Sequence, residues 1–142
     1  MGLAERRAAK QFETEKLPKL QAEINQVVEF EVPLEIDWLA IAADGYADDY
    51  TEFFYKVYFL PLIEALRDIC MHDMGKQALR YGLRKVVVTN QDTPHPQFAD
   101  GVLYLLYSSV TNIDYWIERK TDIQIVLVSG CSRVTNALIR GR

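Results

Sequence analysis

The residues with the clearest capacity for chemistry lie in one polar segment of the chain, residues 90–101. His95 stands there between two prolines, and Asp92 and Asp100 lie on either side of it. An imidazole titrates near neutral pH, so a loop histidine beside carboxylates can exchange protons or bind a polar ligand. The sequence therefore predicts a candidate ligand site at Asp92, His95 and Asp100, which would serve a small enzyme or a ligand-binding domain.

A second set of polar residues is a cluster of carboxylates. Asp44, Asp48 and Glu52 would share one helical face, and Asp49 lies among them. Calcium and magnesium bind oxygen ligands, but the spacing does not match a calcium-binding loop. A solvated acidic helix start explains the cluster better, although it could also contribute to the His95 pocket. We expect no metal site and no cofactor.

A third feature is an alternating segment, residues 29–38, which predicts a strand with one apolar and one polar face. Pro33 cannot donate a hydrogen bond to a neighbouring strand, so this strand is expected at a sheet edge. Its polar face would carry the carboxylates Glu29, Glu31, Glu35 and Asp37. An acidic surface of this kind can dock a basic partner.

Aromatic residues are concentrated between Tyr50 and Phe59, in a segment with helical periodicity. Tyr55 and Phe59 project away from its main apolar stripe. Protein interfaces are enriched in aromatic side chains, so these two residues are predicted to join the acidic strand in an interaction surface. Burial of the segment within the domain is the alternative.

These observations lead to two hypotheses for function. The first is a non-enzymatic protein-protein interaction module that binds a protein partner or forms a homodimer. The second is the ligand site around His95. No catalytic serine elbow, nucleotide-binding loop or zinc motif occurs in the sequence. A pocket with His95 facing a carboxylate would favour the ligand site, whereas a flat apolar patch beside the acidic strand would favour the interaction module.

The elements that would position these residues begin with helices. Residues 1–29 are mostly helix formers, and the main helix is expected to begin at Pro18, because proline is tolerated only in a first turn. Residues 1–16 before it form a separate helix or a loosely attached arm. A second helix starts near Tyr46 and is interrupted at Pro61. A short helix capped by Asp73 is expected to end at Gly82, with Gly82 in a left-handed conformation.

The second half of the chain predicts strands and a final helix. Residues 85–89 and 102–107 are expected to pair as antiparallel strands, with residues 90–101 as the loop between them. The final helix should stop at Gly130, leaving residues 131–142 as an irregular tail. The predicted fold is α+β: a small antiparallel, or mixed, sheet of about three strands against three to five helices.

Composition limits the class of protein. The 142 residues are 49% hydrophobic and 25% charged, which is typical of one globular domain over residues 1–142. The net charge of -4 argues against general nucleic-acid binding. Apolar runs are too short for a membrane helix, and the two cysteines are too few for a disulfide framework, so we expect a cytoplasmic protein that binds no membrane.

Overall fold

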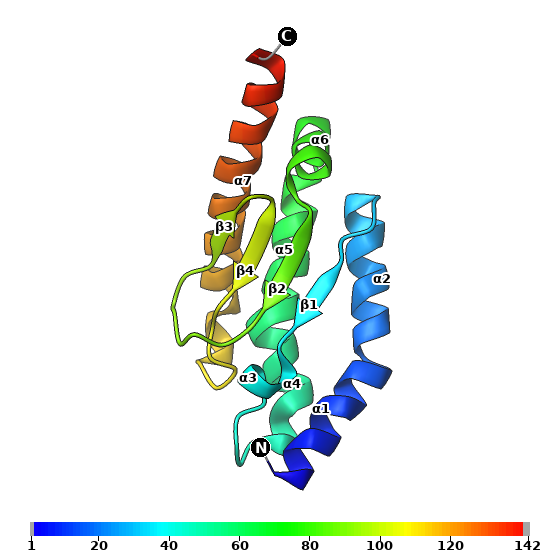
Figure 1. Ribbon diagram of the computed structural model, residues 1–142, viewed down its shortest axis with the longest axis vertical. Helices are drawn as coiled ribbons and strands as arrows, with labels where there is room; N and C mark the ends of the chain where they lie inside the picture. Colours follow the sequence, from blue (N-terminus) through cyan, green and yellow to red (C-terminus); the bar gives the residue numbers. More distant parts are fainter. Residues whose placement is uncertain (1, 141–142) are drawn as a thin grey trace.

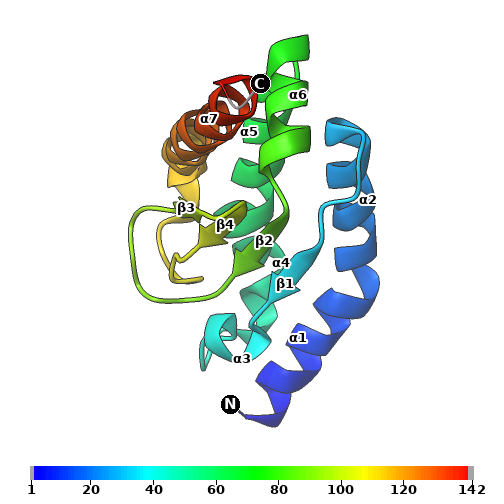
Figure 2. The ribbon, with the colours of Figure 1, turned by 45° about the horizontal axis from the view of Figure 1, so that its top comes forward.

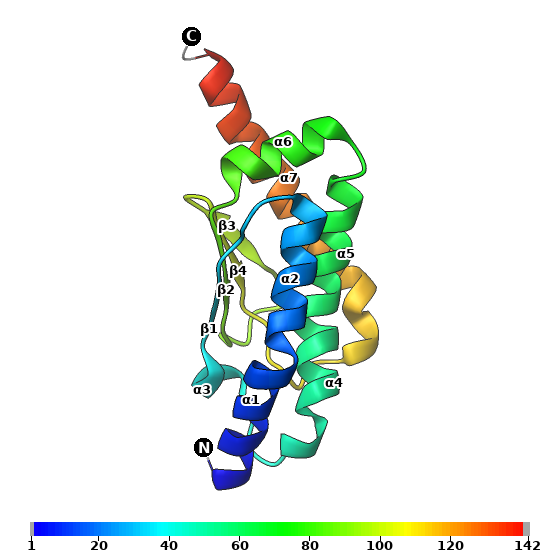
Figure 3. The same ribbon diagram turned by 90° about the vertical axis from the view of Figure 1, so that its right-hand side faces the viewer.

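The computed structural model describes residues 2–140, with side chains for residues 2–131, and has an α+β fold. A mixed sheet forms one layer and helices cover one of its faces (Figures 1 and 3). The α+β prediction is confirmed, although the sheet has four strands rather than about three. Their order is β1-β2-β4-β3, and the strands are β1 (Leu34–Ile36), β2 (Lys85–Val88), β3 (Gln97–Ala99) and β4 (Val102–Leu105).

The helical segments follow the chain as α1 (Leu3–Glu15), α2 (Leu17–Val28), α3 (Trp38–Ile41), η1 (Ala47–Asp49), α4 (Tyr50–Phe54), η2 (Tyr55–Phe59), α5 (Leu60–Ile69), α6 (Asp73–Gly82), η3 (Ile113–Tyr115) and α7 (Trp116–Arg140). α2 begins at Leu17, one residue before the expected Pro18, and α6 ends at Gly82 as predicted, although Asp73 is its first residue rather than its cap. α1 is a separate helix rather than a loose arm, because Ala9 and Phe12 are buried. α4, η2 and α5 run on from one another, and the predicted interruption at Pro61 is preceded by a π-helical turn in which the Leu60 N–H donates to the Tyr55 carbonyl.

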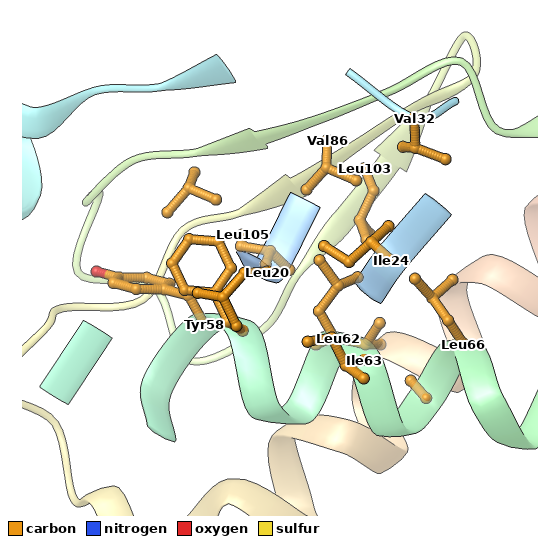
Figure 4. Close-up of a cluster of buried hydrophobic side chains, with 14 of the residues drawn as sticks. Leu20, Ile24, Val32, Tyr58, Leu62, Ile63, Leu66, Val86, Leu103 and Leu105 are labelled. Carbon is orange, nitrogen blue, oxygen red and sulfur yellow. The ribbon is translucent and has the colours of Figure 1, made fainter. Parts of the chain in front are cut away.

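The hydrophobic core lies between the sheet and the helices α2 and α5. In Figure 4, Leu20 and Ile24 of α2 meet Leu62 and Leu66 of α5 beneath the inner face of the sheet. Burial alternates along β2 and β4, so every second side chain points into this core. The strands contribute Val86, Leu103 and Leu105.

The pairing of β2 and β4 corrects the sequence prediction. The two strands are parallel, as are β1 and β2, and only β3 runs antiparallel to its neighbour β4. Asp100 and Gly101 have φ of 54° and 82° and form a two-residue hairpin turn between Ala99 and Val102. Because β3 lies within the segment predicted as a loop, the chain reverses once more than expected and β4 enters the sheet parallel to β2.

β1 is an edge strand, as predicted, but much shorter than the alternating segment that contains it. Two side chains of α2 explain why it starts late. Gln21 Nε2 donates to the Val32 carbonyl at 2.7 Å, and the Val32 N–H donates to Asn25 Oδ1 at 3.0 Å. Val32 is therefore bonded to helix side chains and not to a neighbouring strand. Asp37 ends the strand by capping α3, where it accepts from the Ala40 N–H.

Gly82 and Gly130 were both expected to end helices; only Gly82 does so, and both allow close packing. α7 does not stop at Gly130 but continues to Arg140, so the predicted irregular tail is wrong for residues 131–140, while residues 141–142 lie outside the described part of the chain. A Cβ at Gly130 would overlap the ring of Phe98 in β3. A Cβ at Gly82, which has no left-handed φ, would lie 2.9 Å from Cys131 Sγ.

Candidate functional site

The aromatic part of the predicted interaction surface is wrong at Phe59. Phe59 is fully buried, and its ring stacks on Phe12 with the ring centroids 5.8 Å apart. The reason is that α1, which the sequence left as either a helix or a loose arm, docks against the aromatic segment. Tyr55 is 37% exposed and lines a separate hollow beside α1 and α2.

The carboxylates of residues 29–38 do not form one acidic strand face. Only Glu35 lies in β1, where it pairs with Lys85 at 3.5 Å. Glu29 ends α2 in a left-handed conformation and pairs with Lys76 at 3.0 Å. Asp37 caps α3, and Glu31 is exposed in the connection before β1. The prediction of an acidic face on a ten-residue strand is therefore wrong.

The outer face of the sheet is open to solvent. No element of the described chain covers it in Figures 1 and 3. Val87 and Tyr104 are partly exposed at its centre and are paired across β2 and β4. The same cross-strand row continues to Glu35 on one side and Gln97 on the other. A small apolar patch thus lies beside the edge strand.

The structure separates the three residues of the predicted ligand site. The exposed His95 faces a carboxylate that the sequence did not indicate, with Nδ1 3.4 Å from Asp122 Oδ2. Asp92 lines a pocket together with Asp122. Asp100 lies in the β3–β4 turn, where its carbonyl accepts a hydrogen bond from Arg84, and does not line that pocket. The combination of Asp92, His95 and Asp100 in one site is therefore wrong at Asp100.

The second acidic cluster, Asp48, Asp49 and Glu52, lies in a different part of the molecule from the pocket of Asp92. Asp48, Asp49 and Glu52 line the hollow between α1, α2 and α4, and none of them lines the pocket of Asp92. Glu52 pairs with Lys56 at 3.1 Å. The cluster therefore does not contribute to a site with His95.

The pocket of Asp92 lies where β2 and β4 end. These strands are parallel, so their carboxyl ends meet at one edge of the sheet, a common place for ligand sites in sheets with parallel strands. The segment between β2 and β3 curves around the chain that follows β4 (Figure 2). The pocket has a volume of about 240 Å³. Its walls are Asp92, Thr93 and Pro94 after β2, Tyr107, Ser108 and Thr111 after β4, and Tyr115, Glu118, Arg119 and Asp122 at the start of α7.

Two nearly inaccessible polar side chains line this pocket. Tyr107 is 2% exposed and Arg119 is 6% exposed. Neither the Tyr107 hydroxyl nor the Arg119 Nε has a hydrogen-bond partner among the described residues. Buried polar atoms are nearly always paired in folded proteins, so two unpaired atoms on residues that line one pocket are exceptions. We call Tyr107 and Arg119 the pocket floor.

Arg119 is held in place by its other donors. Nη1 donates to the Asn112 carbonyl at 2.8 Å and Nη2 to the Lys56 carbonyl at 3.4 Å. The guanidinium carbon lies 5.8 Å from the centre of the Tyr107 ring. No carboxylate of the described chain forms an ion pair with Arg119. The guanidinium is thus fixed and buried, with Nε unpaired among the described residues.

The electrostatics of the floor follow from its burial. Burial lowers the pKa of Arg119, but a guanidinium keeps its charge throughout the accessible pH range. Burial also raises the pKa of Tyr107, and the negative charge of Asp122 raises it further. Tyr107 is therefore neutral at physiological pH, and its hydroxyl can donate a hydrogen bond.

Backbone contacts hold the walls of the pocket against one another. The N–H groups of Gln91 and Thr93 donate to the Leu106 carbonyl at 3.0 and 3.3 Å, which fixes the chain after β2 to the end of β4. Asp92 lies between them with φ of 50°. The buried Tyr58 hydroxyl donates to the Tyr107 carbonyl at 2.6 Å. The pocket is therefore built on well-supported backbone rather than on a loose loop.

The sequence analysis missed Tyr107, Arg119 and Asp122, although it contained a signal for Arg119. Arg119, Ile123, Leu127 and Cys131 recur every four residues and form the buried stripe of α7. A charged residue in an apolar stripe is an informative exception, since buried charges require specific partners. The Asp100-Gly101 pair also predicts a hairpin, which would have placed β4 differently.

Comparisons with protein-family models, curated proteins and solved structures find no significant match to this chain. Among the side chains described, those of residues 2–131, no three histidine, cysteine or acidic groups lie together as a metal ion would need. No helix within residues 2–140 has the length and hydropathy of a transmembrane span.

Proposed function

We propose that this chain is a ligand-binding domain that holds a small polar molecule in the pocket at the carboxyl ends of β2 and β4. The observation that carries the proposal is the pocket floor, where Arg119 and Tyr107 present two buried donors without protein acceptors. A ligand oxygen that accepts from both would remove the free-energy cost of leaving them unpaired.

Binding is favoured over catalysis by the position of His95. Its side chain contacts Asp122 on the outside and is 73% exposed, and His95 does not line the pocket. A general base must reach the proton that it abstracts, and His95 does not face the floor donors. In this proposal the His95 and Asp122 pair steadies the rim of the pocket.

The experiment that tests binding uses acetamide and acetate as minimal acceptors. Ligands of four heavy atoms bind weakly, so backbone amide shifts should be followed up to about 100 mM of each compound. We expect concentration-dependent shifts confined to the residues around Tyr107 and Arg119. Tyr107→Phe should weaken binding at least about threefold, because it removes one donor and no bulk. Tyr104→Phe, the same change on the outer sheet face, should leave binding unchanged. Shifts spread evenly over the surface would contradict the proposal.

A second candidate function, the homodimeric interaction module, is supported by the open sheet face. Val87 and Tyr104 form an apolar centre, and the oppositely charged Glu35 and Lys85 lie beside it. A twofold interface must be self-complementary, and a face that carries both charges meets that requirement. Light scattering over a concentration series tests this. Tyr104→Lys should keep the protein monomeric at concentrations where the wild type associates. Tyr81→Lys, at an exposed position of α6, should associate like the wild type.

A further inference from the structure

We infer that the pocket selects a small zwitterion, an amino-carboxylate in which one end is a carboxylate and the other an ammonium. This inference rests on the proposed ligand-binding function and assigns the chemical class of its ligand. It is drawn from the separation of charges between the floor and the rim of the same pocket.

The floor requires an anionic group. Arg119 is buried and charged, and its contacts are two backbone carbonyls and an aromatic ring. The neighbouring Glu118 carboxylate acts on it only through space, without an ion pair. An unpaired buried charge is costly, and a carboxylate that accepts from Nε would neutralise it. Tyr107 lines the same pocket, and its unpaired hydroxyl would donate to the second carboxylate oxygen after a small rotation of the side chain.

The rim requires a cationic group. Three carboxylates line the pocket, those of Asp92, Glu118 and Asp122, against the single positive charge of Arg119. A simple anion would reach the floor only past this negative rim, and a simple cation would leave Arg119 unneutralised. A molecule with both charges satisfies both ends.

The pocket is small, with a volume of about 240 Å³, and suits a small molecule. Glycine, β-alanine and 4-aminobutyrate differ in the number of methylene groups, and so in the distance, between their charges. These three compounds are the appropriate probes.

The decisive experiment compares dissociation constants from backbone amide shifts for the three amino-carboxylates, for acetate, for methylammonium and for acetamide. At least one amino-carboxylate should bind tenfold or more tightly than both acetate and methylammonium, because only the zwitterion pairs with both floor and rim. If acetate or acetamide binds as tightly as the best amino-carboxylate, the zwitterion inference is overturned while the ligand-binding function stands. If no compound shifts the pocket signals, both are overturned.

A variant of the rim gives a sharper test, because it should act in opposite directions on two compounds. Asp122→Asn should weaken the best amino-carboxylate at least threefold, since a partner of the ammonium is lost. The same variant should strengthen acetate binding, since repulsion at the rim falls. Asp100→Asn is the matched control, because Asp100 lies in the β3–β4 turn and asparagine tolerates its left-handed φ. If Asp122→Asn weakens both compounds equally, or if Asp100→Asn has the same effects, the rim does not read the ligand's charge.

Discussion

Two buried tyrosines differ in whether the folded chain itself satisfies their hydroxyl groups. Tyr58 donates to the Tyr107 carbonyl at 2.6 Å, whereas the Tyr107 hydroxyl meets no acceptor among the described residues. Both hydroxyls are buried. The same substitution at the two positions therefore separates a structural hydrogen bond from a donor kept for a ligand.

We expect Tyr58→Phe to lower the free energy of unfolding by about 0.5–1.5 kcal/mol, the net worth of a hydrogen bond. Tyr107→Phe removes no bond within the protein, so it should leave that free energy unchanged or raise it by up to about 1 kcal/mol. Urea unfolding of both variants checks the pair of signs. An equal loss at both positions would mean that Tyr107 is already bonded in the ligand-free protein.

Phe59 and Phe53 test the corrected burial of the aromatic segment. Phe59 is fully buried against Phe12, so Phe59→Ala should cost about 3–5 kcal/mol of unfolding free energy. Phe53 is only partly buried and its ring packs on the exposed Tyr46, so Phe53→Ala should cost less, about 1–2 kcal/mol. Denaturant unfolding compares the two variants directly. A smaller cost at Phe59 would show that α1 does not cover this ring in solution.

At the scale of elements, α7 meets the sheet through a glycine. In an ordinary helix interior, Gly→Ala stabilises a protein by about 1 kcal/mol. Gly130→Ala should instead destabilise this protein by about 1–3 kcal/mol, because the new Cβ would overlap the Phe98 ring. The sign of the change, measured by thermal unfolding, is the prediction.

A double variant shows whether the ring is the cause. Removing the ring with Phe98→Ala should convert Gly130→Ala from a destabilising to a stabilising change, which a double-mutant cycle detects. Ser129→Ala, one residue earlier and exposed, serves as the helix-propensity control and should be nearly neutral. If Gly130→Ala is stabilising in the wild-type background, α7 does not approach β3 as closely as described.

The elements that could be predicted from the sequence are those fixed by local periodicity. α2 and α6 follow to within a residue or so from apolar spacing and from residues that favour helix starts and ends. Strand pairing depends on distant partners, and the alternation of residues 29–38 could not reveal that Gln21 and Asn25 occupy the backbone of Val32. Of the pocket residues, the sequence predicted Asp92. Asp122 and the pocket floor could not be placed beside it without knowing that β2 and β4 pair in parallel.

At the scale of the whole molecule, one sheet face is packed and the other is open. The helices bury the inner face, and the carboxyl ends of the parallel strands converge beside the start of α7 (Figures 1 and 3). The tyrosines of this chain also differ in how deeply they are buried. Of its eight tyrosines, Tyr50, Tyr58 and Tyr107 are almost completely buried.

The buried tyrosines should make the fold sensitive to alkali. Burial raises the pKa of Tyr50 to about 12 and also raises the pKa values of Tyr58 and Tyr107. Above pH 10 the unfolded chain loses these protons while the folded chain keeps them. The free energy of unfolding should therefore be unaffected by these tyrosines below about pH 9 and fall above pH 10 by about 1.4 kcal/mol per pH unit for each of them. Urea unfolding at a series of pH values measures this slope, and tyrosinate absorbance should show the exposed tyrosines titrating before the fold is lost.

Tyr58→Phe should reduce the slope by about one such increment, whereas Tyr81→Phe, on the 63% exposed Tyr81, should leave it unchanged. Equal slopes in the two variants would mean that Tyr58 is not protected from ionisation by the core.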